Sequence, residues 1–191
     1  MGRSKVDILA SLLDTETKLH CDIVTEVALH LGKTLRLPDE ELYNLKMVTH
    51  LHDIGKVKIP INIINKRGKL TVDEYKLIML HSSIGDELYT KFTGHKDNTG
   101  IIRHHHEKWN GEGYPDKLRG IEIPLLARIV AIADVYEALR SARPYKNSWS
   151  HNKTSSYILT NGGSMFDPNL TAVYYKENKA IDKLWVGLRN G

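Results

Sequence analysis

Residues 125–139 read LLARIVAIADVYEAL and follow Pro124, a residue suited to the first position of a helix. In a helix, the apolar side chains of this segment would point to nearly every side, and a helix of that kind is buried. We therefore expect it to lie at the centre of the fold. Asp134 interrupts the apolar run, and a buried acid is costly unless it is paired or bound to a metal ion. Asp134 is thus the first candidate for a functional residue.

The segments on either side of this helix carry helical signals of their own, namely apolar residues at helical spacing, capping boxes and prolines at the first turn. We expect these helices at about 6–33, from Pro38 toward Gly55, from the Thr71–Glu74 capping box through His81, at 98–106, at 150–160, and after Asp167-Pro168. Residues 58–70 are expected to form a connector, and strand signals are short. The sequence therefore predicts an all-α fold, with a single domain over residues 1–191 and a core at about 10–180.

Composition excludes several classes of protein. The chain has 191 residues, of which 41% are hydrophobic and 26% charged, as in ordinary soluble domains. Its single cysteine, Cys21, excludes an internal disulfide and fits a reducing compartment. A membrane span is excluded because no run of about 18 apolar residues occurs. Without a secretory signal, we expect a cytoplasmic location. The net charge of +4 suits an anionic ligand but is too small to indicate nucleic-acid binding.

Eight acidic and histidine side chains fall on or beside the expected helices. They are Glu16, His20, His52, Asp53, His81, His105, His106 and Asp134. Carboxylates and imidazoles without thiolates favour Fe, Mn or Zn in a hydrolytic site over a structural zinc site. Eight ligands exceed the needs of one ion, so we expect two or three divalent ions that share a carboxylate and a hydroxide. Clusters of this kind serve displacement at a phosphoester.

Each of these residues also has a purely structural interpretation. Glu16 and His20 are four residues apart and would form a solvated pair on one helix face. His81 would be a hydrogen-bonded helix residue, and Asp134 would accept hydrogen bonds in a core network. The remaining histidines and the cysteine are assigned to surface or packing positions: His30, His50, His95, His104, His151 and Cys21.

The order of the eight residues resembles that of the HD-GYP family of HD-superfamily phosphohydrolases. Residues 52–56 read HDIGK, and residues 105–115 read HHEKWNGEGYP, which follows the pattern HHExWxGxGYP. The similarity continues through residues 123–139, 143–146 and 166–168, and so covers essentially the whole chain. Asn110 and Glu137 stand where the family usually has Asp, and Lys18 replaces a small residue. The resemblance implies an HD-domain helical bundle with a central metal site and a GYP loop.

Members of that family typically hydrolyse the bacterial second messenger cyclic di-GMP. The resemblance therefore implies a phosphodiesterase that yields linear pGpG or GMP, with a metal-bridging hydroxide as the nucleophile and Fe or Mn as the metal. Two alternatives stay open. One is an HD-type phosphohydrolase acting on another cyclic dinucleotide or nucleotide, and the other is a weakly catalytic cyclic-dinucleotide sensor. A second copy of the chain, a diguanylate cyclase or a regulatory domain are the protein partners to be considered.

The resemblance also implies roles for individual residues. Asp53 and Lys56 would be the catalytic pair, with Asp53 bridging two metals, and Glu16 would allow a third metal to bind. Glu107 would orient a histidine from behind. The residues expected to bind substrate, through its phosphates or by shaping its pocket, are Lys56, Gly113, Tyr114, Pro115, Arg143 and Lys146.

Overall fold

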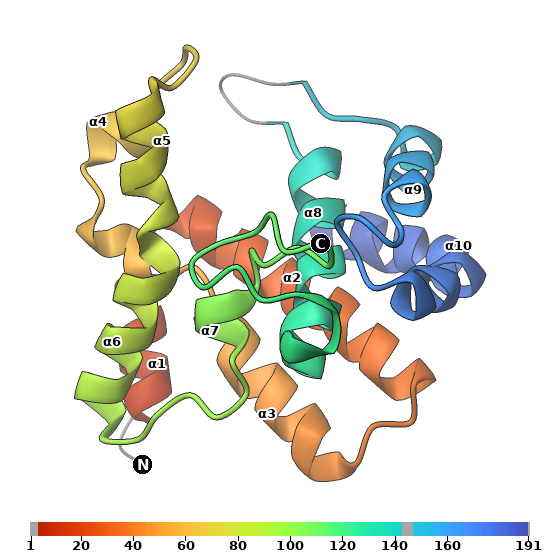
Figure 1. Cartoon of the computed structure of the whole chain (residues 1–191), viewed down its shortest axis with the longest axis horizontal. Helices are drawn as coiled ribbons and strands as arrows, with labels where there is room; N and C mark the ends of the chain where they lie inside the picture. The colour runs from red at the N-terminus through yellow and green to blue at the C-terminus, as the bar shows by residue number, and fades with distance from the viewer. Residues whose placement is uncertain (1–3, 143–146, 191) are drawn as a thin grey trace.

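The computed structural model describes residues 4–142 and 147–190, which form helices joined by loops (Figure 1). Of the described residues, 67% are helical. Within the described ranges the only β-type pairing is one isolated bridge between Gly162 and Phe166. The predicted all-α class is confirmed.

The helices that precede the central one are α1 (Lys5–Ala10), α2 (Thr15–Thr34), α3 (Asp39–Thr49), the 3-10 helix η1 (Ile54–Lys58), α4 (Ile61–Ile64), α5 (Val72–Met79), α6 (His81–Thr93), α7 (Ile101–His104) and the 3-10 helix η2 (Gly120–Glu122). The central helix and those that follow it are α8 (Leu125–Arg140), α9 (His151–Thr160) and α10 (Pro168–Asn190). No described helix combines the length and the apolar character needed to cross a membrane.

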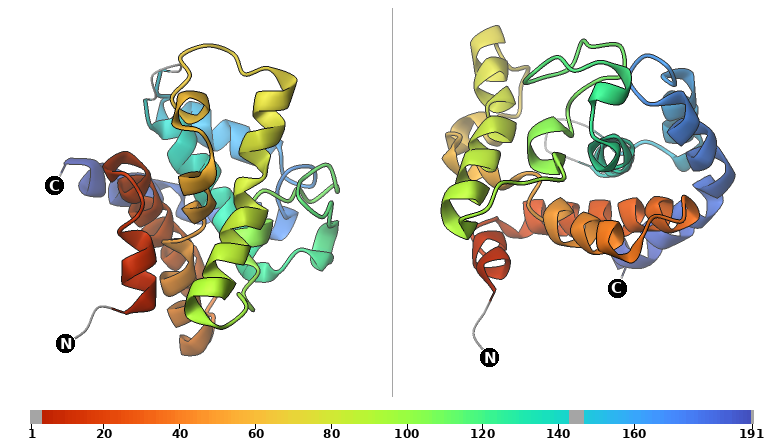
Figure 2. Two further views of the ribbon diagram at one scale, coloured as in Figure 1. Left: turned by 90° about the vertical axis from the view of Figure 1, so that its left-hand side faces the viewer. Right: turned by 60° about the horizontal axis from the view of Figure 1, so that its bottom comes forward.

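Helix α8 lies at the centre of the fold, as its sequence predicts. It packs against α2, α3, α7, α9 and α10. The right-hand view of Figure 2 looks along its axis and shows the other helices around it. Ile129, Val130 and Ile132 have no exposed surface. Asp134 is therefore carried into the interior on the most enclosed helix of the fold.

Several predicted helices are interrupted or shorter than their patterns suggest. The helix expected over 6–33 is broken, and α2 begins after Asp14, whose side chain accepts a hydrogen bond from the Thr17 backbone N–H at 2.9 Å. Helix α3 ends at Thr49 rather than at Gly55, and α7 covers only part of 98–106. The predicted connector contains the short helix α4. The capping box at Thr71 is present as predicted, but α5 ends at Met79, so His81 opens the separate helix α6.

The turn after α3 packs closely against the start of α6. A Cβ on Gly55 would lie 1.9 Å from the carbonyl oxygen of His81, so only glycine allows the two backbones to approach this far. This approach places His52 and Asp53, just before η1, beside the first residue of α6. The turn after α3 and the start of α6, which are distant in sequence, are thereby brought together.

Candidate metal centre

The eight predicted ligands come from five segments of the chain. Helix α2 carries Glu16 and His20, the turn after α3 carries His52 and Asp53, and α8 carries Asp134, while His81 opens α6 and His105 and His106 follow α7. Seven of the eight fall into two compact groups, in each of which the potential ligand atoms lie within 4.8 Å of one another. The first group is Asp53, His81, His105 and His106, and the second is His20, His52 and Asp134.

Asp53 lies between the two groups and faces both. Its Oδ1 is 3.3 Å from Nε2 of His81 in the first group. Its Oδ2 is 3.6 Å from Nε2 of His20 and 3.5 Å from Nε2 of His52 in the second. A carboxylate with one oxygen toward each group is suited to bridge two cations. Within the second group, Oδ1 of Asp134 lies 3.1 Å from Nε2 of His20.

The buried histidines turn the same ring nitrogen toward the centre. Nδ1 of His52 lies 2.7 Å from the Thr49 carbonyl oxygen, and Nδ1 of His81 lies 2.7 Å from that of Ile78. Nδ1 of His105 lies 3.0 Å from the carbonyl oxygen of the residue three positions earlier. A carbonyl only accepts, so each Nδ1 carries the proton and each neutral ring presents the lone pair of Nε2 to the centre. This arrangement is typical of histidines that bind metal ions.

His52 gives the sharpest test of whether a metal ion fits this centre. Its Nε2 is buried and has no hydrogen-bond partner within the described chain. The nearest carboxylate oxygens, on Asp53 and Asp134, are 3.5 and 4.0 Å away. A buried lone pair without a partner costs free energy, which coordination of a cation would recover. The donor set of imidazole nitrogens and carboxylate oxygens suits Fe, Mn or Zn.

Burial keeps most of the imidazoles neutral. It lowers the pKa of His81 to about 4, and burial together with the neighbouring His52 lowers that of His105 to about 4 as well. The pKa values of His52 and His106 are also lowered, chiefly by burial. Neutral imidazole is the form that binds a metal ion, so these rings are ready to coordinate at neutral pH.

The carboxylates of the centre are ionised, and they attract positive charge. Burial alone would raise the pKa of Asp53, but Lys56 and the neighbouring histidines outweigh it and hold that pKa well below its usual value. The pKa of Asp134 is likewise well below its usual value, because the hydrogen bond and charge of His20 outweigh burial. Burial opposes the shift at His20 too, yet the carboxylates of Asp134 and Glu137 raise its pKa to about 9. The centre thus favours cations.

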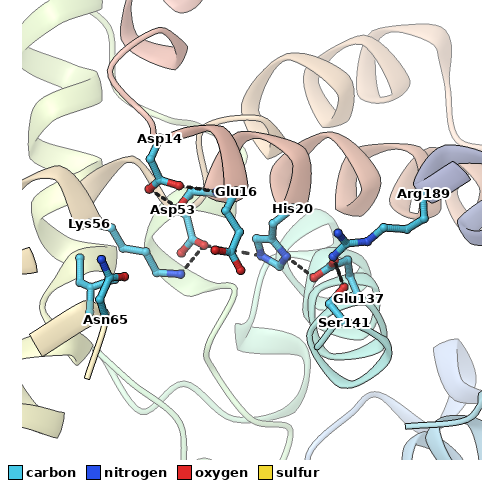
Figure 3. A pocket seen from close by; sticks show the side chains of 11 residues that line it. Asp14, Glu16, His20, Asp53, Lys56, Asn65, Glu137, Ser141 and Arg189 are labelled. Carbon is cyan, nitrogen blue, oxygen red and sulfur yellow. Dashed lines mark hydrogen bonds and ion pairs between the residues drawn. The ribbon is translucent and has the colours of Figure 1, made fainter. Parts of the chain in front are cut away.

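Glu16 is the one predicted ligand outside both groups. It is exposed, and it lines a small cavity of about 100 Å³ that also reaches His20, Asp53 and Lys56. Figure 3 shows its side chain beside that of Asp53, among the residues that line this cavity. Glu16 is thus near the second group without being part of it.

A larger cleft of about 330 Å³ is lined by Asp53 and by the three histidines of the first group. Lys56 borders both cavities, and its ammonium forms an ion pair with Oδ2 of Asp53. Tyr114 lines the larger cleft and packs its ring on that of His106, with centroids 4.8 Å apart. The cleft therefore offers a cation, an aromatic ring and the metal-binding group on one surface.

The GYP loop is held by its backbone. A Cβ on Gly113 would lie 2.3 Å from the backbone nitrogen of Lys108, so the loop folds back tightly on its own start. Pro115 follows a cis peptide bond. Glu107, which the sequence predicts to orient a histidine, accepts a hydrogen bond from the Asp116 backbone N–H at 2.7 Å. The buried carboxylate therefore orients the loop, and its role toward a histidine stays a prediction. Arg143 and Lys146, two of the predicted phosphate contacts, lie outside the described residues.

Sequence reasoning missed one residue that touches the centre. Glu137 is 1% exposed, and its Oε2 forms a short contact with Nδ1 of His20. Glu137 is three residues after Asp134, so helical spacing shows that the two share a face of α8. That His20 lies against this face could not be read from spacing, because His20 is 117 residues away in sequence.

The residues assigned to packing lie outside the two groups, with one partial exception. His30 pairs with Glu177 at 2.7 Å and His50 with Asp22 at 2.9 Å, both near the surface. Cys21 is 1% exposed, as expected of a small core residue, and its sulfur lies within 4.8 Å of ligand atoms of His52 and Asp53.

Comparison with known proteins agrees with this geometry. A family model described as HD domain matches residues 3–170. The cyclic di-GMP phosphodiesterase response regulator RpfG of Xanthomonas campestris is 41% identical over 173 residues, which are 90% of this chain and 46% of that protein. The 3'3'-cGAMP-specific phosphodiesterase 2 of Vibrio cholerae is 36% identical over 81% of this chain and 30% of its own length. The chain thus spans less than half the length of these curated relatives.

Among solved structures, an HDG"Y"P protein from Bdellovibrio bacteriovorus superposes with a TM-score of 0.69. The superposition covers 91% of this chain and 56% of that one, at 20% sequence identity. At this identity the likeness concerns the fold, and it shows the same helical arrangement.

Proposed function

The chain belongs to the HD domain family, of the HD-GYP type, and from this premise we propose that it is a metal-dependent phosphodiesterase that hydrolyses cyclic di-GMP. The single observation that carries the proposal is Asp53 between two groups of ligand atoms, with one oxygen toward each. The catalytic unit in this proposal is one domain over residues 1–191. A cytoplasmic location stays a prediction, as does a second copy, a diguanylate cyclase or a regulatory domain as partner.

The metal ions in this proposal are two divalent ions, Fe or Mn, with a third if Glu16 also binds. Asp53, His81, His105 and His106 would hold one ion, and His20, His52 and Asp134 would hold the other with Asp53. When bound, such a pair lowers the pKa of water and stabilises charge on the attacking and leaving oxygens of a phosphodiester. The unpartnered Nε2 of His52 and the neutral state of His52 and His105 support this assignment.

The substrate in this proposal lies in the larger cleft. Lys56 would place its ammonium beside a non-bridging phosphate oxygen, because it borders the cleft and already contacts Asp53. Arg143 and Lys146 would contact the phosphates, and Arg143 would do so with two parallel hydrogen bonds. Residues 113–115 would shape the wall that faces the base, with Tyr114 as its aromatic surface.

A second substrate, 3'3'-cyclic GMP-AMP, is the alternative that a specific observation favours. Several relatives of this chain are named as phosphodiesterases specific for it, at 31–39% identity. The two dinucleotides share the phosphodiester ring and differ in one base. The metal centre would serve both, and the walls of the cleft would decide between them. Hydrolysis to linear pGpG or onward to GMP is also part of the proposal.

The test combines metal analysis with turnover on one sample. Protein purified without oxygen is analysed for Fe and Mn and then given cyclic di-GMP, 3'3'-cyclic GMP-AMP and pGpG in parallel. We expect two or more ions per chain and hydrolysis of cyclic di-GMP at the highest initial rate. Replacing Asp53 by Ala should remove turnover and most bound metal while the helical circular dichroism is kept. Asp73→Asn, which removes an exposed carboxylate on α5, is the matched control.

Three outcomes would contradict the proposal. Full activity in the Asp53→Ala variant would exclude a metal mechanism at this centre. Bound metal and bound cyclic di-GMP without turnover would favour the sensor alternative, and a higher rate with 3'3'-cyclic GMP-AMP would replace the first substrate by the second.

A further inference from the structure

Helix α10 reaches the metal centre through its last turns. Its Arg189 donates from Nη2 to Oε1 of Glu137 at 2.9 Å, and the same nitrogen contacts Oγ of Ser141. The other oxygen of Glu137, Oε2, contacts Nδ1 of His20. Figure 3 shows these side chains in a row, from Arg189 on α10 through Ser141, just after α8, and Glu137 on α8 to His20 on α2. Three helices therefore meet in one chain of polar contacts that ends on a predicted metal ligand.

The face of α10 that carries Arg189 is docked firmly on α8. Asp182 accepts a hydrogen bond from Nη2 of Arg140 at 2.7 Å. The ring of Trp185 lies under the Arg140 guanidinium, 4.3 Å from its centroid, and that of Arg189 is 5.8 Å from the same centroid. Ile181 is fully buried in the core. Asp182, Trp185 and Arg189 are spaced by three and four residues, so they lie on one side of the helix.

Because these contacts hold α10 in place, Arg189 meets Glu137 at a fixed position. It lies beyond residues 3–170, the part that matches the HD domain family. A substitution at Arg189 removes its own contact with the Trp185 ring but keeps the burial of Ile181 and the contact of Trp185 with Arg140. The polar contact can therefore be removed without removing the helix.

We propose that Arg189 is a positioning residue for the second ligand group, acting through Glu137 on the ring of His20. Arg189 and Ser141 fix Oε1 of Glu137, which fixes the direction in which Oε2 meets Nδ1 of His20. Nε2 of His20 is thereby held 3.1 Å from Oδ1 of Asp134 and 3.6 Å from Oδ2 of Asp53. The inference rests on the proposed function only in taking His20, His52 and Asp134 as ligands of a divalent cation.

The geometry matters because His20 differs from the other buried histidines of the centre. His52, His81 and His105 are oriented by carbonyl oxygens three or four residues earlier in the chain. His20 is oriented by a carboxylate from another helix, and that carboxylate has several torsions of its own. Without Arg189 the carboxylate of Glu137 loses one of its contacts at Oε1, and we expect the ring of His20 to be held less firmly. The first ligand group contains no residue of this chain of contacts.

Positioning and simple electrostatics predict opposite results at Arg189. Removing a positive charge near the centre would by itself strengthen the binding of a cation. Losing the alignment of His20 would weaken it, since outer partners of metal-binding histidines contribute about 10–100-fold to affinity. The sign of the change in metal affinity therefore separates the two effects.

The experiment is a titration of metal-free protein with Mn²⁺, followed by electron paramagnetic resonance, for the full chain and its variants. In Arg189→Met we expect one Mn²⁺ site to weaken by about tenfold, the lower end of that range, while the other is unchanged. Arg189→Lys keeps a cation in place and should recover most of the loss. Lys183→Met is the matched control, because it removes the same charge from an exposed position on the same helix.

A double-mutant cycle tests whether Arg189 acts through Glu137. In a Glu137→Gln background, Arg189→Met should have little further effect on Mn²⁺ affinity, because the path to His20 is already broken. Circular dichroism melting shows that each variant is folded, and if Arg189→Met is not, Arg189→Lys and Ser141→Ala carry the test. Equal or tighter Mn²⁺ binding in Arg189→Met, or additive effects in the cycle, would overturn the inference. Mn²⁺ binding that follows these expectations in a protein without phosphodiesterase activity would overturn the proposed function alone.

Discussion

Arg103 holds Asp116 with two parallel hydrogen bonds, from Nε at 2.6 Å and from Nη2 at 2.8 Å. His104 adds a third contact to the same carboxylate at 2.9 Å. Asp116 directly follows Pro115, and its backbone N–H is bound by Glu107. These hydrogen bonds thus hold the GYP loop against α7, the helix that leads into His105 and His106. The wall of the larger cleft is therefore joined by hydrogen bonds to the segment that carries two predicted ligands.

The contact between Arg103 and Asp116 makes a pH-dependent contribution to the stability of the fold. The side-chain hydrogen bond from Arg103 is the main cause that lowers the pKa of Asp116 to about 2, against about 4 in an unfolded chain. The contribution is therefore complete above about pH 4 and is lost as the pH falls toward 2. We expect Asp116→Asn to lower the free energy of unfolding by at most about 1 kcal/mol at pH 7, because the pair is partly exposed. Urea unfolding at several pH values should show this difference shrink below about pH 4.

Asp73→Asn serves as the control for Asp116→Asn, because the Asp73 carboxylate is exposed on α5. A difference between wild type and Asp116→Asn that stays constant from pH 7 down to pH 2.5 would rule out the Arg103 contact as its source.

The close approach at Gly55 makes a prediction about stability and about the centre together. In Gly55→Ala the new methyl group would meet the His81 carbonyl at 1.9 Å, so η1 or the start of α6 must shift. We expect a loss of at least about 3 kcal/mol in the free energy of unfolding, the upper range for overpacking. Gly68→Ala is the control, since nothing lies within 4 Å of a Cβ there. Equal urea midpoints for the two variants would contradict the packing argument.

Metal removal should destabilise the fold. The centre gathers ionised carboxylates around unpartnered or weakly partnered imidazole nitrogens, and a cation bound only by the folded chain stabilises it. With Mn²⁺ at a hundredfold excess over Kd, each ion contributes about 2.7 kcal/mol, or about 5–10 °C in Tm. Chelator should lower the calorimetric Tm by this amount, and re-added Mn²⁺ should restore it. A Tm that is indifferent to both treatments would argue against the centre.

The start of α10 is anchored by a buried ion pair. Nη1 of Arg128 lies 2.6 Å from Oδ2 of Asp167, whose side chain is 4% exposed. Oδ1 of Asp167 also accepts the Asn169 backbone N–H at 2.8 Å and so caps the helix. Removing one partner leaves the other charge buried, which costs about 3–5 kcal/mol.

We therefore expect Arg128→Met to lower the free energy of unfolding by about 3 kcal/mol, measured by urea denaturation. Lys176→Met, at an exposed site on α10, the helix that Asp167 caps, should stay within about 0.5 kcal/mol of wild type. Similar losses of unfolding free energy in Arg128→Met and Lys176→Met would mean that the ion pair contributes nothing beyond its charge.

The parts of the fold that the sequence predicts well are those set by neighbours in the chain. The Thr71–Glu74 capping box, Pro124 before α8 and Asp167 before α10 each act within one helical turn, and each is present. The breaks at Asp14 and between α5 and α6 were not predicted. Apolar spacing continues across them, and the chain bends there to pack on other helices.

The candidate centre shows the same division. Motif and residue type select the eight ligands, and seven of them lie in two groups, while their roles stay predictions. Which partner Glu107 binds, and that Glu137 reaches His20, depend on how a loop returns on itself and on how α8 crosses α2. Contacts across 9 and 117 residues of sequence leave no periodic signal.

The hydrogen bonds behind the imidazoles bear on how this centre could be transplanted. His52, His81 and His105 each come with their own alignment inside a short turn, so a designer could graft them onto another helical scaffold as self-contained pieces. His20 cannot be moved in this way, because the residues that align its ring lie on α8 and, in the case of Arg189, on α10. A graft that copied the motif letters alone would reproduce three well-aimed rings and one that turns freely.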